Sequence, residues 1–243
     1  MRGLEARHLA DLQFREVSRA LRALSSAYVE RRRGLAGGAA LSGAGKRAAF
    51  ALFYGPLHYL IVREIVAALP SATTAIGSTL VDLGCGTGAA GAAWASLCEP
   101  KPPVVAIDKH PWALDEAART YREFGLLAKT RLADMAVVNL PKTPTAFLAA
   151  FTLNELPDPA REALLTRLVE RACQSQGDRV LIVEPIAGFV APWWNKWRAT
   201  FEASGGRADE WRVRPPLPAI VAKLDRAAGL DHRELTARSL WIG

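Results

Sequence analysis

The sequence predicts an α/β fold, in which a doubly wound and mostly parallel sheet follows a helical N-terminal extension. After Leu80, short apolar runs alternate with segments of helical periodicity. The first of these runs breaks directly into a glycine-rich turn, and 50% of the 243 residues are hydrophobic. Short apolar strands that alternate with helices are typical of a parallel sheet covered on both faces. The chain is long enough to bury one sizeable core.

The first 70 residues are expected to form a separate, basic helical region. Apolar residues recur at helical spacing over 9–33, which predicts an amphipathic helix with its basic side chains outside. The glycines of 34–45 predict a flexible turn. A second helical stretch over 46–69 is expected to be broken or bent at Gly55-Pro56.

Residues 71–243 are expected to form the α/β domain. Runs rich in apolar and β-branched residues predict strands near 79–83, 103–107, 130–133, 145–152, 179–184 and 234–241. Helices are expected near 88–97, 111–123, 158–172, 190–203 and 216–228. The antiparallel last strand that often completes such a sheet is not evident after the run that ends at Gly243. Ligands of these sheets bind at the carboxyl ends of the strands.

Positive charge is concentrated near the N-terminus. Residues 1–50 hold ten Lys and Arg against four Asp and Glu, whereas the rest of the chain is close to neutral. Such asymmetry indicates a polyanionic partner such as RNA. A solvated helical face is the alternative interpretation. The RNA contacts that we expect are Arg31, Arg32, Arg33, Lys46 and Arg47.

Other classes of protein are disfavoured by composition. No apolar run approaches the roughly 18 residues that cross a bilayer, and the first residues lack the pattern of a secretion signal. The three cysteines, Cys85, Cys98 and Cys173, are widely spaced and predict neither a disulfide framework nor a metal site. We therefore expect a cytoplasmic protein with no membrane partner and no metal. The oligomeric state is left open.

The glycine-rich turn LVDLGCGTG fits two classes of ligand. Gly84, Gly86 and Ala89 match a dinucleotide-binding pattern, with Asp108 at the spacing of its ribose-binding acid. Asp82 argues against that class, because a carboxylate near a pyrophosphate is repulsive. S-adenosylmethionine carries no phosphate, and its sulfonium and ammonium groups are attracted to a carboxylate. The turn therefore predicts S-adenosylmethionine.

The same turn resembles the first motif of the class I S-adenosylmethionine-dependent methyltransferases. The resemblance implies a Rossmann-like methyltransferase fold, with Asp108 bridging the ribose hydroxyls. It also implies that Asp134 accepts from the adenine amino group while Met135 lies against the ring. Any one acid at a strand end is alternatively a turn or helix cap. The expected cofactor-binding residues are Asp82, Gly84, Cys85, Gly86, Gly88, Asp108, Lys109, Asp134, Met135 and Phe151.

The stretch LNELPD after the fourth strand bears on the methyl acceptor. It lacks the [N/D/S]-P-P-[Y/F] sequence common in amino-methylating enzymes of this fold. It resembles an element of the methyltransferase-like family associated with the mitochondrial small ribosomal subunit, and this likeness spans about 46–190. That family usually carries iron-sulfur cysteines after the next strand, and VAPWWNKWRATFEASGG has none. The resemblance implies rRNA or another ribosome-related RNA as the acceptor.

Asn154 and Glu155 are the candidate catalytic residues, because they stand where the methyl group should emerge. A carboxylate there can act as a base or orient the acceptor. Glu155 is alternatively a cap of the following helix, and Glu184 has the same ambiguity. Three tryptophans after the fifth strand are expected to be core residues, with stacking on a base as the alternative. They are Trp193, Trp194 and Trp197.

The function predicted from the sequence is methyl transfer from S-adenosylmethionine to rRNA or ribosome-associated RNA. One alternative keeps the chemistry and changes the acceptor to a small molecule. Another is a non-catalytic, cofactor-binding factor of ribosome assembly. The sequence does not separate slow catalysis from none, and it does not name the acceptor atom.

Overall fold

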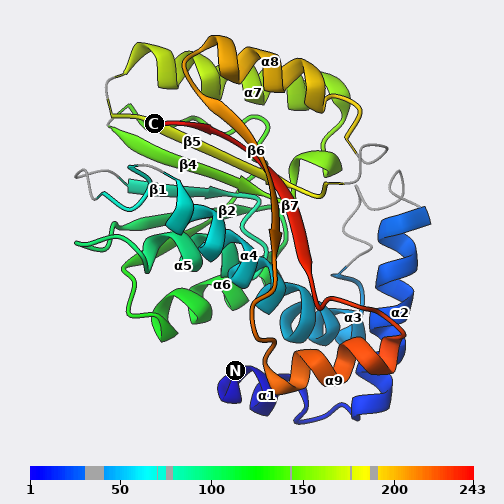
Figure 1. The fold of residues 1–243 in the computed structure, drawn as a ribbon. Helices are drawn as coiled ribbons and strands as arrows, with labels where there is room; N and C mark the ends of the chain where they lie inside the picture. Colours follow the sequence, from blue (N-terminus) through cyan, green and yellow to red (C-terminus); the bar gives the residue numbers. More distant parts are fainter. Residues whose placement is uncertain (31–40, 70, 75–78, 143, 176, 187–190) are drawn as a thin grey trace. The chain divides into compact units, whose positions relative to one another are not determined.

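A seven-stranded sheet forms the centre of the fold. The computed structural model describes residues 1–30, 41–69, 71–74, 79–142, 144–175, 177–186 and 191–243. The strand order is β3-β2-β1-β4-β5-β7-β6 (Figure 1). The strands are β1 (Thr79–Leu83), β2 (Val104–Asp108), β3 (Ala128–Leu132), β4 (Thr145–Ala150), β5 (Arg179–Glu184), β6 (Arg207–Val213) and β7 (Leu235–Ile242). Strands β1 to β5 pair in parallel, so the predicted mostly parallel sheet is confirmed.

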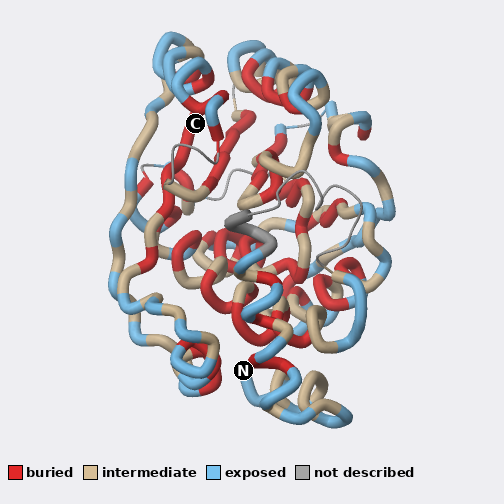
Figure 2. Tube along the Cα trace, turned by 90° about the vertical axis from the view of Figure 1, so that its right-hand side faces the viewer, coloured by how far each residue is buried: buried red, intermediate tan, exposed pale blue. Residues whose placement is uncertain are grey.

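Helices cover both faces of this sheet. Helices α5 (Ala89–Ala95) and α6 (Pro111–Glu123) lie on one side, and α7 (Asp158–Gln174) and α8 (Trp194–Ala203) lie on the other (Figure 1). Because both faces are covered, β5 is buried at all six residues, and its four central residues, VLIV, are a continuous apolar run. Figure 2 shows the buried residues of the chain in red. Four of the predicted helices are thus found, and residue 190, the first residue of the fourth prediction, lies outside the described residues.

The antiparallel strand of the sheet is the run that the sequence predicted last, not a further strand after it. The predicted run 234–241 forms β7, which pairs antiparallel with β5 from Val180 opposite Ile242 to Glu184 opposite Arg238. The strand that sequence reasoning missed is β6, which lies at the edge of the sheet beside β7. Its sequence, RADEWRV, alternates between exposed and half-buried residues and includes no fully buried position. An edge strand of this kind lacks the apolar signal on which strand prediction depends.

The chain divides into two compact units. The first comprises Met1–His58 and Val213–Leu235, and the second comprises Tyr59–Arg212 and Thr236–Gly243. The sequence placed the boundary after residue 70 and assigned 213–235 to the α/β domain. In the structure, α9 (Ala219–Ala228) packs on the N-terminal helices, with Lys223 Nζ 4.4 Å from the centre of the Phe14 ring. Local periodicity predicts a helix but does not reveal which core it joins.

The first unit contains α1 (Arg2–His8), α2 (Phe14–Glu30) and α3 (Ala44–Ala49). The predicted helix over 9–33 begins later, at Phe14. The Glu16 carboxylate accepts a hydrogen bond of 2.7 Å from the backbone N–H of Gln13, which is half of a capping box and fixes this start. The predicted bend lies before Pro56, at a π-helical turn over Phe50–Tyr54. Proline has no N–H to donate, and a widened turn accommodates that loss.

One helical stretch has the length and apolar composition of a membrane span. Within the described part of the chain, Ala44–Ala68 meets this criterion, and it includes α4 (Gly55–Ala68). The sequence predicts a helix here, over 46–69, but no membrane span. In its most apolar 18-residue window, 61% of the residues are buried inside the protein. A core helix shows the same length and composition, so the stretch is weak evidence for a membrane span.

Asp178, near the start of β5, connects α7 to the sheet through hydrogen bonds. This carboxylate is buried, accepts from the Thr145 N–H at 2.7 Å and accepts from Arg171 Nε at 2.8 Å. We expect Asp178→Ala to reduce the free energy of unfolding by about 2–4 kcal/mol, because it leaves a buried N–H and a guanidinium without their acceptor. Urea denaturation measures the loss. Asp209→Ala, which breaks an exposed ion pair with Arg207, is the control and should change stability by less than about 1 kcal/mol. Equal losses in the two variants would contradict the assignment.

Candidate functional site

The glycine-rich turn links the end of β1 to the start of α5. Gly84, Gly86 and Gly88 have φ angles of +66°, +52° and +74°, in the left-handed region that favours glycine. A Cβ atom on Gly84 would lie 2.2 Å from Thr152 Oγ1. The turn therefore requires glycine for its backbone and, at Gly84, for the close approach of the segment that follows β4.

Asp82 lies buried beneath this turn, with 1% of its surface exposed. Its carboxylate accepts a hydrogen bond of 2.6 Å from the Tyr121 hydroxyl and another from the Gly91 N–H. Burial raises the pKa of Asp82 to about 6, and these hydrogen bonds oppose the rise. The structure thus gives Asp82 partners in α5 and α6. The attraction of a cofactor's cationic groups to this carboxylate stays a prediction.

Gly91 and Tyr121 are site residues that sequence reasoning missed. A Cβ atom at Gly91 would lie 2.4 Å from Asp82 Oδ2 and 2.5 Å from the Tyr121 hydroxyl oxygen. The sequence does contain an indication of the role of Gly91, because it is a glycine within an alanine-rich helix, where helix propensity favours alanine. Tyr121 gave no signal, because its partner is 39 residues away in the sequence.

Asp108 ends β2 and holds two backbone groups of the site. One carboxylate oxygen accepts from the Gly86 N–H at 2.9 Å, and the other accepts from the His110 N–H at 2.8 Å. Each oxygen has a further lone pair, so the arrangement fits the predicted bridge to ribose hydroxyls. Nearby, Cys85 is buried, and burial raises the pKa of its thiol well above the ordinary value. Lys109 is exposed.

Asp134 and Met135 follow β3 in the chain. The Asp134 carboxylate accepts from the Ala136 N–H at 2.8 Å, so part of its role is to hold the local turn. Met135 is 8% exposed, and its sulfur lies 3.8 Å from Thr152 Oγ1, the hydroxyl that also approaches Gly84. The structure therefore brings Met135 and the glycine-rich turn to the same side chain. Adenine contacts of Asp134 and Met135 stay predictions.

The segment after β4 brings the candidate catalytic residues to the same edge of the sheet. Phe151 has a φ of +58° although it is not glycine, and its N–H donates to the Val183 carbonyl at 2.8 Å. A short 3-10 helix over Leu153–Glu155 follows. Burial raises the pKa of Glu155 to about 7, with the positive charge of Lys109 lowering it and the negative charge of Asp108 raising it. Glu155 is thus an electrostatic neighbour of the predicted ribose-binding residue.

The alternative role of Glu155 as a helix cap is not found. The N-cap of α7 is Pro157, and this helix start has no side-chain cap hydrogen bond. A carboxyl group whose pKa lies near neutrality can accept a proton at physiological pH, which is the requirement for a general base.

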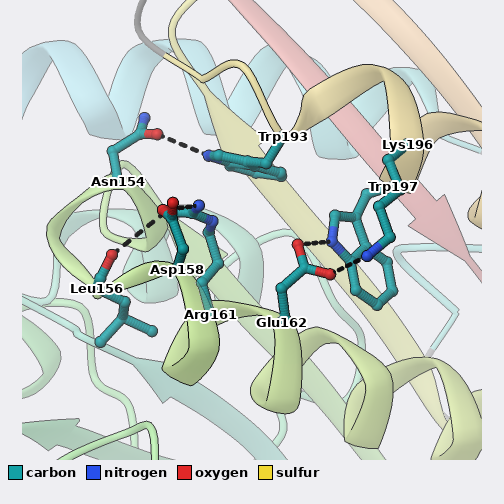
Figure 3. Close-up of polar contacts among 8 residues, drawn as sticks. All are labelled: Asn154, Leu156, Asp158, Arg161, Glu162, Trp193, Lys196 and Trp197. Carbon is teal, nitrogen blue, oxygen red and sulfur yellow. Dashed lines mark hydrogen bonds and ion pairs between the residues drawn. The ribbon is translucent and has the colours of Figure 1, made fainter.

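Asn154 is held by side chains from two other elements. Its Oδ1 accepts from Trp193 Nε1 at 2.9 Å, and its Nδ2 donates to Glu184 Oε2 at 2.5 Å (Figure 3 shows the first contact). The following turn is fastened by Arg161, which donates to the Leu156 carbonyl at 3.2 Å and lies 5.3 Å from the centre of the Trp193 ring. Arg161 was not among the predicted site residues, and the sequence left Glu184 open between a site residue and a helix cap.

The three tryptophans are core residues, as the sequence analysis favoured. Trp193, Trp194 and Trp197 are 6%, 5% and 3% exposed. Trp197 also donates to Glu162 at 2.8 Å, and the same carboxylate pairs with Lys196 (Figure 3). Their burial excludes the alternative in which an exposed pair stacks on a base.

The predicted RNA contacts are only partly described by the structure. Arg31, Arg32 and Arg33 lie outside the described residues. Lys46 donates to Ser42 Oγ at 3.2 Å, and Arg47 donates to the Leu41 carbonyl at 2.9 Å. The five residues stay predictions.

Residues 80–177 match the family model described as "Methyltransferase domain". No curated protein sequence gives a significant match to the chain. Among solved structures, the chain is similar to a mitomycin 7-O-methyltransferase, at 15% identity and a TM-score of 0.55, over 87% of this chain and 60% of that one. It is also similar to an O-methyltransferase from neocarzinostatin biosynthesis, solved with S-adenosylmethionine and a naphthoic acid, at 16% identity and a TM-score of 0.51, over 85% and 59%.

These findings agree with the architecture of the sheet and of the glycine-rich turn. The chain spans about 60% of the length of the two solved proteins, and the likeness to them is one of fold. The predicted Rossmann-like fold is confirmed, and the match to a methyltransferase domain covers residues 80–177. S-adenosylmethionine as the ligand of the glycine-rich turn stays a prediction.

We expect Asp108→Ala to weaken the binding of S-adenosylmethionine by about 1–3 kcal/mol, because the Gly86 and His110 N–H groups and the ribose hydroxyls lose an acceptor. Calorimetric titration measures this change. Asp115→Ala, at an exposed position of α6, is the matched control and should bind as the native protein does. Native protein that binds NAD tightly and gives no heat with S-adenosylmethionine would contradict the cofactor assignment.

Proposed function

We propose that this chain transfers the methyl group of S-adenosylmethionine to RNA, with rRNA or another ribosome-related RNA as the acceptor. The observation that carries the proposal is the separation of charge between the two units. The first unit holds fourteen Lys and Arg against seven Asp and Glu, whereas the second holds seventeen of each. The whole net charge of +7 therefore belongs to the unit that lacks the methyltransferase domain, as expected of a region that binds a polyanion.

Helix α2 presents part of this charge on one face. Arg15, Arg19 and Arg22 are exposed and follow a spacing of four and three residues, which places them on the same side of a helix. The opposite side carries Val17, Leu21 and Leu24, each with no exposed surface. None of the three arginines has an ion pair with another residue that the structure describes. A row of exposed guanidinium groups can contact successive phosphates of a nucleic-acid backbone.

The likeness of LNELPD to the methyltransferase-like family of the mitochondrial small ribosomal subunit also supports an RNA acceptor. In the proposed reaction, Glu155 removes a proton from the acceptor while Asn154 holds it. Methyl transfer is an in-line displacement at the sulfonium carbon, so holding the two reactants in line supplies much of the rate. The raised pKa of Glu155 suits it to the role of base.

A small-molecule acceptor is the second candidate. The burial of all three tryptophans favours it, because the described part of the site then lacks those rings as a stacking surface for a base. The two solved structures described above are named as a mitomycin 7-O-methyltransferase and as an O-methyltransferase from neocarzinostatin biosynthesis. A non-catalytic assembly factor would bind both the cofactor and RNA and transfer no methyl group.

We expect RNA affinity to fall with salt and the arginines of α2 to contribute to that fall. In a plot of the logarithm of the binding constant against the logarithm of the salt concentration, each phosphate contact with a single strand contributes about −0.7 to the slope. The triple variant R15Q/R19Q/R22Q should therefore make the slope less negative by about two. Fluorescence anisotropy with a labelled single-stranded RNA measures it. The companion variant R31Q/R32Q/R33Q should flatten the slope by about the same amount.

The matched control is R122Q/K129Q/R131Q, which removes three exposed charges from the neutral unit. It should leave the slope unchanged. Equal flattening by the control would show that general net charge, and not α2, determines the affinity. If the native protein binds no RNA, a small molecule becomes the favoured methyl acceptor.

We expect methyl transfer to rise with pH through about 7, because Glu155 must lose its proton before it accepts one. Tritiated S-adenosylmethionine and an rRNA transcript give the rate as acid-precipitable counts. E155Q should lower the rate by about 10²–10⁴ and remove this pH dependence.

The pH dependence of stability tests the Glu155 carboxyl group without any methyl acceptor. A carboxyl whose pKa is raised in the folded state stabilises the fold below its unfolded pKa, and this stability is lost as the pH rises through about 7. Relative to E155Q, the native protein should therefore lose stability between about pH 4.5 and 7. Identical pH profiles of the two proteins, in rate and in stability, would contradict the role of Glu155.

A further inference from the structure

The orientation of the Asn154 amide is dictated by its two partners. The Trp193 indole can donate only, so it must face the amide oxygen, at 2.9 Å. The Glu184 carboxylate can accept only, so it must face the amide nitrogen, at 2.5 Å. If the amide were turned over, it would place an N–H against an N–H and an oxygen against an oxygen. One N–H and one lone pair of Asn154 are left over by these contacts.

Glu184 is itself rigidly placed. It ends β5, has no exposed surface, and its other oxygen accepts from the Leu153 N–H at 2.9 Å. The guanidinium of Arg238 is an electrostatic neighbour of Glu184 and lies 4.2 Å from the centre of the Trp194 ring. A carboxylate buried in this way requires hydrogen bonds and a nearby positive charge, and it has both. Glu184 thus holds the backbone of Leu153 and the side chain of Asn154 together.

We propose that Glu184 is a positioning residue, which acts through Asn154 to orient the methyl acceptor. The carboxylate fixes which way the amide faces, so the remaining N–H and lone pair of Asn154 meet the acceptor in one arrangement. An amide used in this way recognises a polar edge, such as the exocyclic amine or carbonyl of a nucleobase. This inference rests on the proposed function and adds the residue that organises the acceptor side of the site.

The test begins with E184Q, which keeps the shape of the side chain but adds an N–H group. Whichever way the new amide turns, one of the two donors, Leu153 N–H or Asn154 Nδ2, then faces another donor. We expect the KM for RNA to rise about tenfold, because a displaced positioning group misaligns the reactants. The Kd for S-adenosylmethionine should change by less than about twofold. Assays are run below the melting temperature of every variant.

A double-mutant cycle shows whether Glu184 acts through Asn154. N154A should raise the KM for RNA by about the same factor as E184Q, and E184Q/N154A should be no worse than N154A alone. D178N is the matched control, since Asp178 is another buried carboxylate that accepts a backbone N–H. It should alter stability and leave the KM unchanged. Additive losses in the cycle, or a rise in KM with D178N equal to that with E184Q, would overturn the inference.

A spectroscopic readout separates this inference from the proposed function. The indole N–H signal of Trp193, assigned with W193F, reports the hydrogen bond to Asn154 without any acceptor. E184Q should shift this signal, and E184Q/N154D should restore it, because a carboxylate at 154 accepts from both neighbours. If no RNA is methylated, the proposed function fails. The Trp193 signal then tests by itself whether Glu184 orients Asn154. A Trp193 signal that E184Q does not move overturns it.

Discussion

The buried carboxylate of Asp82 is the constraint on which the site depends. It stands at the end of β1 and joins two helices to that strand, through the Gly91 N–H of α5 and the hydroxyl of Tyr121 in α6. This arrangement leaves no room for a side chain at Gly91. Burying a carboxylate is unfavourable, and its raised pKa records that penalty. The glycine-rich turn above it therefore follows from packing as much as from ligand binding.

The other acids at the strand ends have a similar double role. Asp108 accepts from Gly86 and His110, Asp134 from Ala136, and Glu184 from Leu153. Backbone N–H groups in loops need acceptors, and a carboxylate supplies strong ones. Each acid holds a loop at the ends of the strands, so the same side chains that are predicted to bind a ligand also shape the site before a ligand arrives. The interpretation of such acids as turn caps and their interpretation as ligand contacts are compatible.

Much of the sheet and part of the site could be predicted from particular residues. The run VLIV of β5 is apolar throughout because both of its faces are covered, and the turn after β1 carries the glycines that its positive φ angles require. Strand β6 could not be predicted, since an edge strand with polar residues resembles a loop. The predicted acids were found at strand ends, but their backbone partners were not foreseen. Tyr121 and Glu184 belong to the site through contacts 39 and 30 residues away.

By itself, the sequence determined the features that depend on neighbouring residues. These are the order of strands and helices, the glycine-rich turn, and the concentration of positive charge before residue 50. The tertiary structure alone decided which elements share a core, and it joined 213–235 to the N-terminal helices. It also decided that Asp82 is buried and that Asn154 lies between Glu184 and Trp193. Periodicity and turn chemistry act over a few residues, whereas these contacts depend on the packing of segments that are distant in the chain.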